Sequence, residues 1–278
     1  MTDRRTPQVH QATVVHTEWL TPHMIRVVFG APGLAGFSAG TYSDHYLKLL
    51  FPVPGVDYPA PFDIAAIRRD MPREQWPRTR TYTVRRWDPT VGELTVDFVH
   101  HGDVGLAGPW AAAARPGDEI MFLGPGGAYA PAEDADWHLL AGDESALPAI
   151  AASVERLPAG APAKVFIEVS GPDEEQKLST YGRAEVVWLH RGDRPVGAAL
   201  VEAVRALEFP PGTVQAFVHG EAHFVKELRR FLRVEHGVTR EQLSISGYWR
   251  LGADEDGWQS SKADWNRRVE EEEAAAVG

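Results

Sequence analysis

No cysteine occurs among the 278 residues of the chain. Disulfide bonds, thiolate metal sites and thiol catalysis are therefore excluded, and the composition fits a reducing compartment. Apolar runs long enough to cross a membrane are also missing, so no membrane span is expected. Residues 1–5 lack the apolar core of a signal peptide, which leads us to expect a cytoplasmic protein.

Positive charge is scarce as well. The 28 Lys and Arg residues face 39 Asp and Glu residues, which gives a formal net charge of −11. A nucleic-acid-binding protein needs a basic face for the phosphates, so no nucleic-acid partner is expected.

The length allows two ordinary domains. Residues 131–136, rich in Pro, Ala and acidic residues, are typical of a linker. We therefore predict a first domain over residues 1–132, a second over 133–248 and a helical tail over 249–278.

The first domain shows short strand patterns separated by turn residues. Residues 52–77 have no clear period and are expected to form a long loop that can include a helical turn. Alternating apolar and β-branched residues predict strands over 11–15, 24–29, 45–51, 80–87, 93–100 and 119–123. With one short helix over 109–114, this pattern predicts a closed antiparallel β-barrel.

In the second domain strands and helices alternate. Strands are predicted over 137–141, 164–169, 185–190, 214–219 and 243–246, and helices over 146–157, 196–207 and 222–235. Nearly continuous apolar strands between helices indicate a parallel sheet covered on both faces. Ser260 and Ser261 are expected to cap a final charged helix over 262–276.

The richest stretch for chemistry runs from residue 80 to residue 110. Alternation along the strand that begins Arg80-Thr81-Tyr82-Thr83 puts Arg80 and Tyr82 on one face. After the strand that ends near residue 99, a loop with spaced glycines leads into a short helix whose first residue is expected to be Pro109. Free N–H groups at such a helix start suit a phosphate.

Three segments resemble those of a known family. Residues 80–85, 97–103 (Asp-Phe-Val-His-His-Gly-Asp) and 142–150 (Gly-Asp-Glu-Ser-Ala-Leu-Pro-Ala-Ile) are similar to signatures of the siderophore-interacting proteins. These are FAD-dependent ferric-siderophore reductases of the ferredoxin-reductase superfamily. The resemblance extends from about residue 9 to residue 266, and it implies an FAD-binding β-barrel followed by a nicotinamide-binding α/β domain.

The resemblance also implies which residues of the first domain hold FAD. Gly108 departs from the family, which often has Ser there, so only backbone N–H groups would serve the diphosphate at this point. The residues implied for FAD are Arg80, Thr81, Tyr82, Thr83, His101, Gly102, Gly105, Ala107 and Gly108.

In the second domain the nicotinamide nucleotide is expected at the loop Asp143-Glu144-Ser145, where the family usually has Thr in place of Ser145. Ligands bind at the carboxyl ends of strands in open α/β sheets. Arg191 matches the basic residue that holds the 2′-phosphate of NADPH in related reductases. This match favours NADPH over NADH, whereas the acidic residues 173–175 argue against it.

Two cations are candidates for the substrate. Lys48 stands where the family often has a basic residue, and Arg250 could add to the same positive patch that attracts an anionic ferric siderophore. His219 and His223 do not match the spacing of a helical zinc site, so no metal site is expected.

No catalytic triad or carboxylate pair stands at a recognisable spacing, which fits an enzyme whose chemistry resides in a cofactor. We expect NAD(P)H to reduce FAD, and siderophore-bound Fe(III) to be reduced and released as Fe(II) in the cytoplasm by a monomeric protein. Alternatives are a general flavin reductase, an electron-transfer partner of an oxygenase, and a non-enzymatic siderophore or flavin carrier. The siderophore and the choice between NADH and NADPH stay open.

Overall fold

The computed structural model describes residues 8–30 and 32–277, so the first residues, used above to expect no signal peptide, lie outside it. The chain forms two compact units, Met1–Ala128 and Tyr129–Gly278. The division falls just before the predicted linker, and the predicted tail belongs to the second unit.

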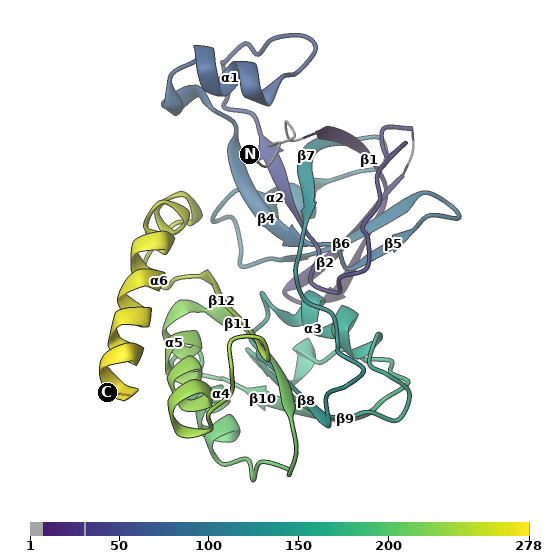
Figure 1. Ribbon diagram of the computed structural model, residues 1–278. Helices are drawn as coiled ribbons and strands as arrows, with labels where there is room; N and C mark the ends of the chain where they lie inside the picture. Colours follow the sequence, from purple (N-terminus) through teal and green to yellow (C-terminus); the bar gives the residue numbers. More distant parts are fainter. Residues whose placement is uncertain (1–7, 31, 278) are drawn as a thin grey trace. The chain divides into compact units, whose positions relative to one another are not determined.

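The first unit is built on one antiparallel sheet of seven strands in the order β4-β3-β7-β1-β2-β6-β5 (Figure 1). The strands are β1 (Val9–Thr21), β2 (Met24–Gly30), β3 (Tyr46–Phe51), β4 (Arg78–Thr83), β5 (Arg86–Asp88), β6 (Glu93–Val99) and β7 (Glu119–Gly126). Antiparallel pairing throughout agrees with the predicted class of sheet.

The sheet does not close by a ladder between its end strands β4 and β5 in the described part of the chain. The strand predicted over 80–87 is instead broken at residues 84 and 85. The Val84 N–H donates to the His45 carbonyl at 2.7 Å, and the Arg85 N–H donates to the Thr95 carbonyl at 3.0 Å. The chain thus crosses from one end of the sheet to the other at this corner.

Alternate residues of these strands form the core of the first unit. Phe29, Phe98 and Phe122 are almost completely buried, with exposed fractions of 1%, 0% and 0%. Burial of each such side chain stabilises the fold by roughly 1.5–3 kcal/mol. The acidic side chain of Asp97 is also buried, and Arg26 neutralises it with two hydrogen bonds of 2.8 Å.

Two short helices and a 3-10 turn complete the first unit: α1 (Ile64–Asp70), α2 (Ala107–Ala113) and η1 (Arg73–Gln75). The loop predicted over 52–77 therefore contains a helix, which Asp63 caps by accepting from Ala65 N–H at 2.8 Å. The position predicted for Pro109 is wrong, because α2 begins at Ala107. Pro109 still lies in the first turn, where its missing N–H costs no hydrogen bond.

The second unit has a five-stranded sheet in the order β10-β9-β8-β11-β12, with every pair parallel. Its strands are β8 (Trp137–Gly142), β9 (Pro162–Val169), β10 (Arg183–His190), β11 (Val214–Glu221) and β12 (Leu243–Trp249). The sequence predicted this parallel sheet. The chain adds strands outward from β8 on both sides, so the strand order reverses next to β8, where ligands of such sheets bind.

Helices cover this sheet on both faces (Figure 1). The helical elements of the second unit are α3 (Leu147–Val154), η2 (Pro172–Glu174), α4 (Ala198–Arg205), α5 (Ala222–Arg230), the π-helical turn η3 (Phe231–Glu235) and α6 (Glu255–Val277). Side chains of α4 and α5 share one apolar cluster with Leu139, Phe166 and Val218 of the strands.

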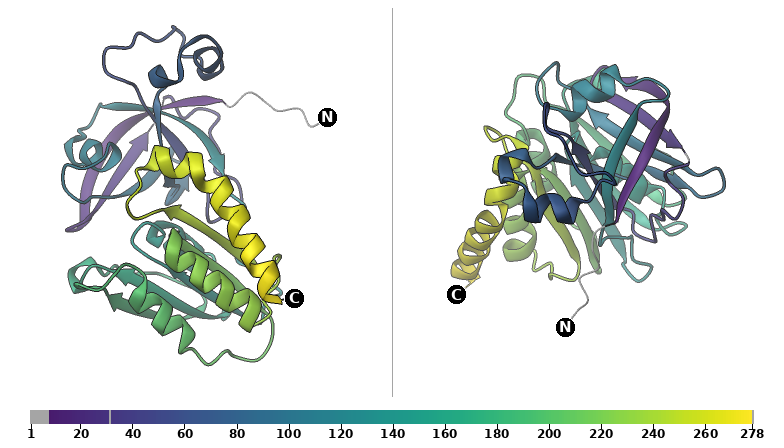
Figure 2. Two further views of the ribbon diagram at one scale, coloured as in Figure 1. Left: turned by 90° about the vertical axis from the view of Figure 1, so that its left-hand side faces the viewer. Right: turned by 90° about the horizontal axis from the view of Figure 1, so that it is seen from above.

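The C-terminal helix α6 lies along α5 in Figure 1 and in the left view of Figure 2. Trp258 and Trp265 of α6 pack against Ala222 of α5, and Trp258 is fully buried. Arg229 of α5 donates to Glu273 of α6 at 2.6 Å. None of the described helices combines the length and the apolar character that crossing a membrane requires.

The predicted cap of this helix is wrong. The helix begins before Ser260 and Ser261, whose hydroxyls donate back to the Gly257 carbonyl at 2.8 and 2.9 Å. Serine hydroxyls inside a helix commonly bond to a carbonyl of the preceding turn. Asp254 accepts the Gly257 N–H at 2.7 Å, as a helix-capping residue does.

Candidate functional site

The strand β4 presents a cation and an aromatic ring on the same face, as alternation predicts. Arg80 pairs with Leu49 and Tyr82 with Leu47, both of them core residues of β3. The Tyr82 ring lies 4.4 Å from the ring of Phe98, and both Arg80 and Tyr82 are half-buried. This contact supports the Tyr82 ring from the side of the core.

The two threonines of this strand differ in exposure. Thr81 is exposed and pairs with Lys48, whereas Thr83 is buried and pairs with Tyr46. Lys48 therefore shares the face of Thr81, opposite to Arg80 and Tyr82. Lys48 is itself exposed, as a contact for an anionic substrate would have to be.

The loop after β6 contains two glycines, Gly102 and Gly105, with open space around them. Gly102 and Gly105 have φ values of 76° and 91°, a region that favours glycine. A Cβ built at either residue would meet no described atom within 4 Å. His101, also exposed, forms a β-bridge with Asp103 in this loop.

The loop ends in α2, where Ala107 and Gly108 are buried. A Cβ at Gly108 would lie 3.0 Å from the Val99 carbonyl oxygen, tighter than most real contacts. The departure from the family at Gly108 therefore accompanies a close approach of α2 to β6.

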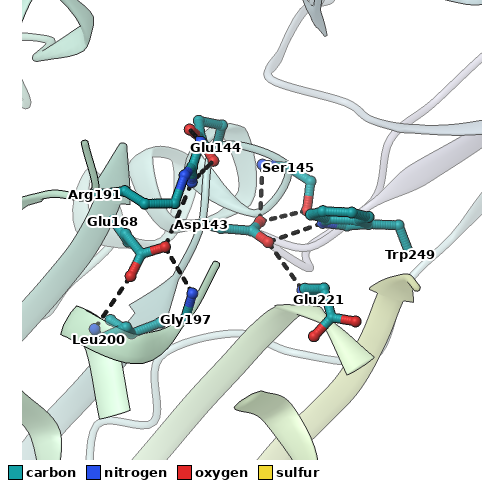
Figure 3. Close-up of polar contacts among 9 residues, drawn as sticks. All are labelled: Asp143, Glu144, Ser145, Glu168, Arg191, Gly197, Leu200, Glu221 and Trp249. Carbon is teal, nitrogen blue, oxygen red and sulfur yellow. Dashed lines mark hydrogen bonds and ion pairs between the residues drawn. The ribbon is translucent and has the colours of Figure 1, made fainter. Parts of the chain in front are cut away.

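The loop after β8 is organised by a buried carboxylate (Figure 3). Asp143 is fully buried and accepts four hydrogen bonds. One oxygen accepts from Ser145 N–H at 2.9 Å and Ser145 Oγ at 2.5 Å. The other accepts from Glu221 N–H at 2.9 Å and Trp249 Nε1 at 2.8 Å. Asp143 thereby joins the carboxyl ends of β8, β11 and β12.

Burial and the neighbouring Glu144 raise the pKa of Asp143 to about 6, although Ser145, Trp249 and Glu221 all donate to it. The Asp143 carboxylate is also closely surrounded by other atoms. A Cβ on Gly220, whose φ is 141°, would lie 2.7 Å from the Asp143 carboxyl carbon, so glycine is required there.

Arg191 lies beside Glu144 of the same loop (Figure 3). Its terminal nitrogens donate to the two Glu144 carboxylate oxygens at 2.7 and 3.1 Å, and one of them reaches Glu168 at 3.4 Å. Burial disfavours the charged guanidinium, but the hydrogen bonds and charges of Glu144 and Glu168 outweigh burial and raise the pKa of Arg191.

Glu168, which was not predicted from the sequence, lies near the end of β9 with no exposed surface. Its oxygens accept from Gly197 N–H at 2.7 Å and Leu200 N–H at 3.3 Å, at the start of α4. A carboxylate inside a nearly continuous apolar strand was the signal that could have found it, because a buried charge needs a partner.

Near the end of β12, Trp249 binds Asp143, and Arg250 follows it, half-buried. Glu221 accepts from His223 N–H at 2.6 Å and from Leu251 N–H at 3.1 Å, and so helps to hold this edge. This role was not predicted from the sequence.

His219, considered above for a metal, is buried near the same edge. Burial, with the charge of Lys262, lowers the pKa of His219 to about 3, so its imidazole is neutral. Its Nε2 lies 3.0 Å from Ser244 Oγ. Among residues 8–30 and 32–277 no group of three or more His, Cys, Asp or Glu side chains is arranged to hold a metal ion.

The residues present fit the two cofactors that the resemblance implies. The first unit offers a fixed ring, a cation and an open loop rich in backbone N–H groups, which suit a flat ring system with a diphosphate. The second offers a rigid loop at the point where strand order reverses in a parallel sheet, which suits a nucleotide.

Comparisons with known proteins agree with this division. Residues 13–129 match the siderophore-interacting FAD-binding domain, and residues 135–252 match the siderophore-interacting protein domain. The first match ends one residue beyond the first structural unit, and the second match lies within the second unit.

Relatives match over nearly the whole chain. An uncharacterized protein of Mycobacterium tuberculosis is 45% identical over 96% of this chain and 97% of its own. The ferric vibriobactin reductase ViuB of Vibrio cholerae is 32% identical, over 89% of this chain and 92% of its own. An NADPH-dependent ferric-chelate reductase of Escherichia coli is 28% identical, over 86% and 92%.

Solved structures show the same architecture. A siderophore utilization protein from T. fusca has a TM-score of 0.78 and 35% identity, covering 91% of this chain and 96% of its own. The siderophore-interacting protein SipS of Aeromonas hydrophila has a TM-score of 0.80 and 29% identity, covering 94% and 99%. The chain belongs to the family of siderophore-interacting proteins.

Proposed function

We propose that this protein is an FAD-dependent NAD(P)H:ferric-siderophore reductase. The observation that carries the proposal is that one matched family domain corresponds to each of the two structural units. Bound FAD would supply the chemistry, taking a hydride from the nicotinamide and giving single electrons to Fe(III).

In the first unit, Arg80 holds the FAD diphosphate by charge-assisted hydrogen bonds, and the Tyr82 ring lies against the flavin. The backbone of the loop at Gly102 and Gly105 approaches the diphosphate, because neither residue carries a side chain. Thr81, Thr83, His101, Ala107 and Gly108 complete the FAD site.

In the second unit, the loop at Glu144 and Ser145 faces the nicotinamide nucleotide. Asp143 positions this loop through its four hydrogen bonds and does not itself touch the nucleotide, because its oxygens are already occupied. Buried, fully bonded groups of this kind hold a site rigid.

Lys48 and Arg250 attract the substrate, an anionic ferric siderophore. Two observations support Lys48. Its side chain is exposed on β3. The same unit also has seven further cations between residues 68 and 86, which add positive charge to this part of the chain. A local cation raises the encounter rate with an anion even in an acidic protein. The iron is released as Fe(II) in the cytoplasm, and the protein acts as a monomer.

The test is an absorbance spectrum of the purified protein under anaerobic conditions. We expect an oxidised flavin band that bleaches on addition of NADH or NADPH and returns on addition of a ferric siderophore. Free flavin in place of the siderophore is the control. Oxidation of NADH or NADPH that proceeds equally with free flavin would favour a general flavin reductase, and a protein without flavin would reject the proposal.

A further inference from the structure

The ion pair between Glu144 and Arg191 bears on which nicotinamide nucleotide the second unit accepts, a question that rests on the proposed function. NADPH differs from NADH by a 2′-phosphate, and a guanidinium that binds such a phosphate must offer its N–H groups to it. In this structure both terminal nitrogens of Arg191 already donate to Glu144, at 2.7 and 3.1 Å.

The two carboxylates around Arg191 are not equivalent. Glu168 has no exposed surface and is fixed by the N–H groups of Gly197 and Leu200 at the start of α4. Glu144 lies on a loop and its side chain is 16% exposed. Glu144 is therefore the group that a phosphate would have to displace.

The local charge also opposes a phosphate. One guanidinium between two carboxylates leaves this cluster with a net charge of −1. Nearby, the exposed Glu175 pairs with His190 at 2.8 Å, and Arg194 donates to Glu202 at 2.7 Å. A dianionic phosphate placed here would meet uncompensated negative charge in a partly buried site, where screening by salt is weak.

We propose that Glu144 is a specificity-determining residue that withholds Arg191 from a 2′-phosphate, so that the protein takes NADH in preference to NADPH. Sequence position alone favoured NADPH, because Arg191 follows the strand where related reductases bind this phosphate. The side chain that occupies Arg191 comes from a different loop, 47 residues earlier in the chain.

Two nucleotide fragments measure the contribution of the 2′-phosphate to binding without any turnover of flavin. Adenosine 2′,5′-bisphosphate and adenosine 5′-monophosphate are titrated into the full-length flavin-loaded protein by calorimetry at fixed ionic strength. We expect the native protein to bind the bisphosphate no more tightly than the monophosphate. This comparison needs no substitution, so it holds whether or not a variant folds.

The variant Glu144→Gln keeps the shape of the side chain and removes its charge. We expect it to bind the bisphosphate roughly ten- to a hundredfold more tightly, the range of one charge-assisted contact, with little change for the monophosphate. The matched control is Glu175→Gln, which makes the same change of charge at an exposed residue without contact to Arg191. Adding Arg191→Ala to Glu144→Gln should abolish the gain.

A native protein that prefers the bisphosphate, or a control that shifts the ratio as much as Glu144→Gln, would overturn the inference. So would a gain that survives Arg191→Ala, or binding of neither fragment. Failure of the proposed function is a separate result: neither NADH nor NADPH would then bleach the flavin in the native protein or in any variant.

Discussion

The first unit carries almost no net charge, whereas the second carries nearly all the negative charge of the chain. Residues 1–128 hold 12 Lys and Arg against 13 Asp and Glu, a net −1. Residues 129–278 hold 16 against 26, a net −10. An acidic surface repels anionic ligands, so the two units are expected to treat phosphates and ferric siderophores differently.

The units also differ in how their candidate sites are built. In the first, a ring, a cation and glycines with open surroundings line one stretch of sequence. In the second, the charged groups bind one another: Asp143 accepts four hydrogen bonds, and Arg191 lies between Glu144 and Glu168. We propose that the first arrangement recognises a ligand by shape and backbone contacts, and the second by the charges that its internal ion pairs leave available.

The largest expected effect tests whether the second unit depends on its C-terminal helix. Trp258→Ala should lower the free energy of unfolding by about 3–5 kcal/mol, because a fully buried indole leaves a cavity. Denaturant unfolding measures the change. Trp19→Ala, which removes an indole that is 51% exposed in the first unit, is the control. Similar losses in the two variants would contradict this account of α6.

The next prediction concerns pH. The folded protein holds a proton on Asp143 up to about pH 6, above the ordinary value near 3.8, so ionisation of this group opposes folding. The contribution of protonated Asp143 to the free energy of unfolding is full below about pH 4 and is lost as the pH rises through 6. Over this window the loss amounts to at most about 3 kcal/mol.

Urea unfolding of the native protein and of Asp143→Asn between pH 4 and 7 measures this contribution. The variant should lack this part of the pH dependence, because its amide does not titrate. Asp193→Asn, at an exposed loop residue, is the control. An unchanged slope in Asp143→Asn would mean that the carboxylate stays ionised throughout.

In the first unit, Arg80→Ala should weaken FAD binding by about ten- to a hundredfold, since a charge-assisted contact contributes roughly 1.5–3 kcal/mol. The flavin content of the purified protein and a titration of the apoprotein with FAD both measure it. Arg86→Ala removes an exposed cation that pairs with Asp88 and should retain FAD. Full flavin content in Arg80→Ala would reject the assignment of this strand.

The smallest expected effect is at the substrate. Lys48→Ala should raise the KM for an anionic ferric siderophore by a few-fold at low salt, and the difference should shrink as salt is added. Flavin content and reduction by NADH should not change. Lys164→Ala, which removes a cation paired with Glu185 in the second unit, is the matched control. Equal effects of the two variants would return Lys48 to the role of a solvated surface charge.

The sequence predicted the features that depend on periodicity and local chemistry. Alternation of residues predicted that Arg80 and Tyr82 share a face of the strand. Apolar strands between helices predicted the parallel sheet. It failed where local signals compete. Ser260 and Ser261 resemble a cap but bond to Gly257 inside a helix, and Pro109 suits a helix start but stands in its third position.

Partners distant in the chain could not be predicted at all. From the sequence, Arg191 was interpreted as available to bind a phosphate. Its partners Glu144 and Glu168 are 47 and 23 residues away from it, so these contacts are not visible in the sequence. The role of Asp143 as an internal acceptor likewise depends on Trp249, 106 residues later. Such contacts arise only when the parallel strands bring their carboxyl ends to one edge.

The most direct test of the account is the amount of Fe(II) trapped by a ferrous chelator for each NADH consumed, measured without oxygen in the presence of a ferric siderophore. A hydride carries two electrons and each Fe(III) takes one, so we predict two Fe(II) for each NADH. Consumption of NADH with no trapped Fe(II), while free flavin is reduced, would contradict the assignment of a ferric-siderophore reductase.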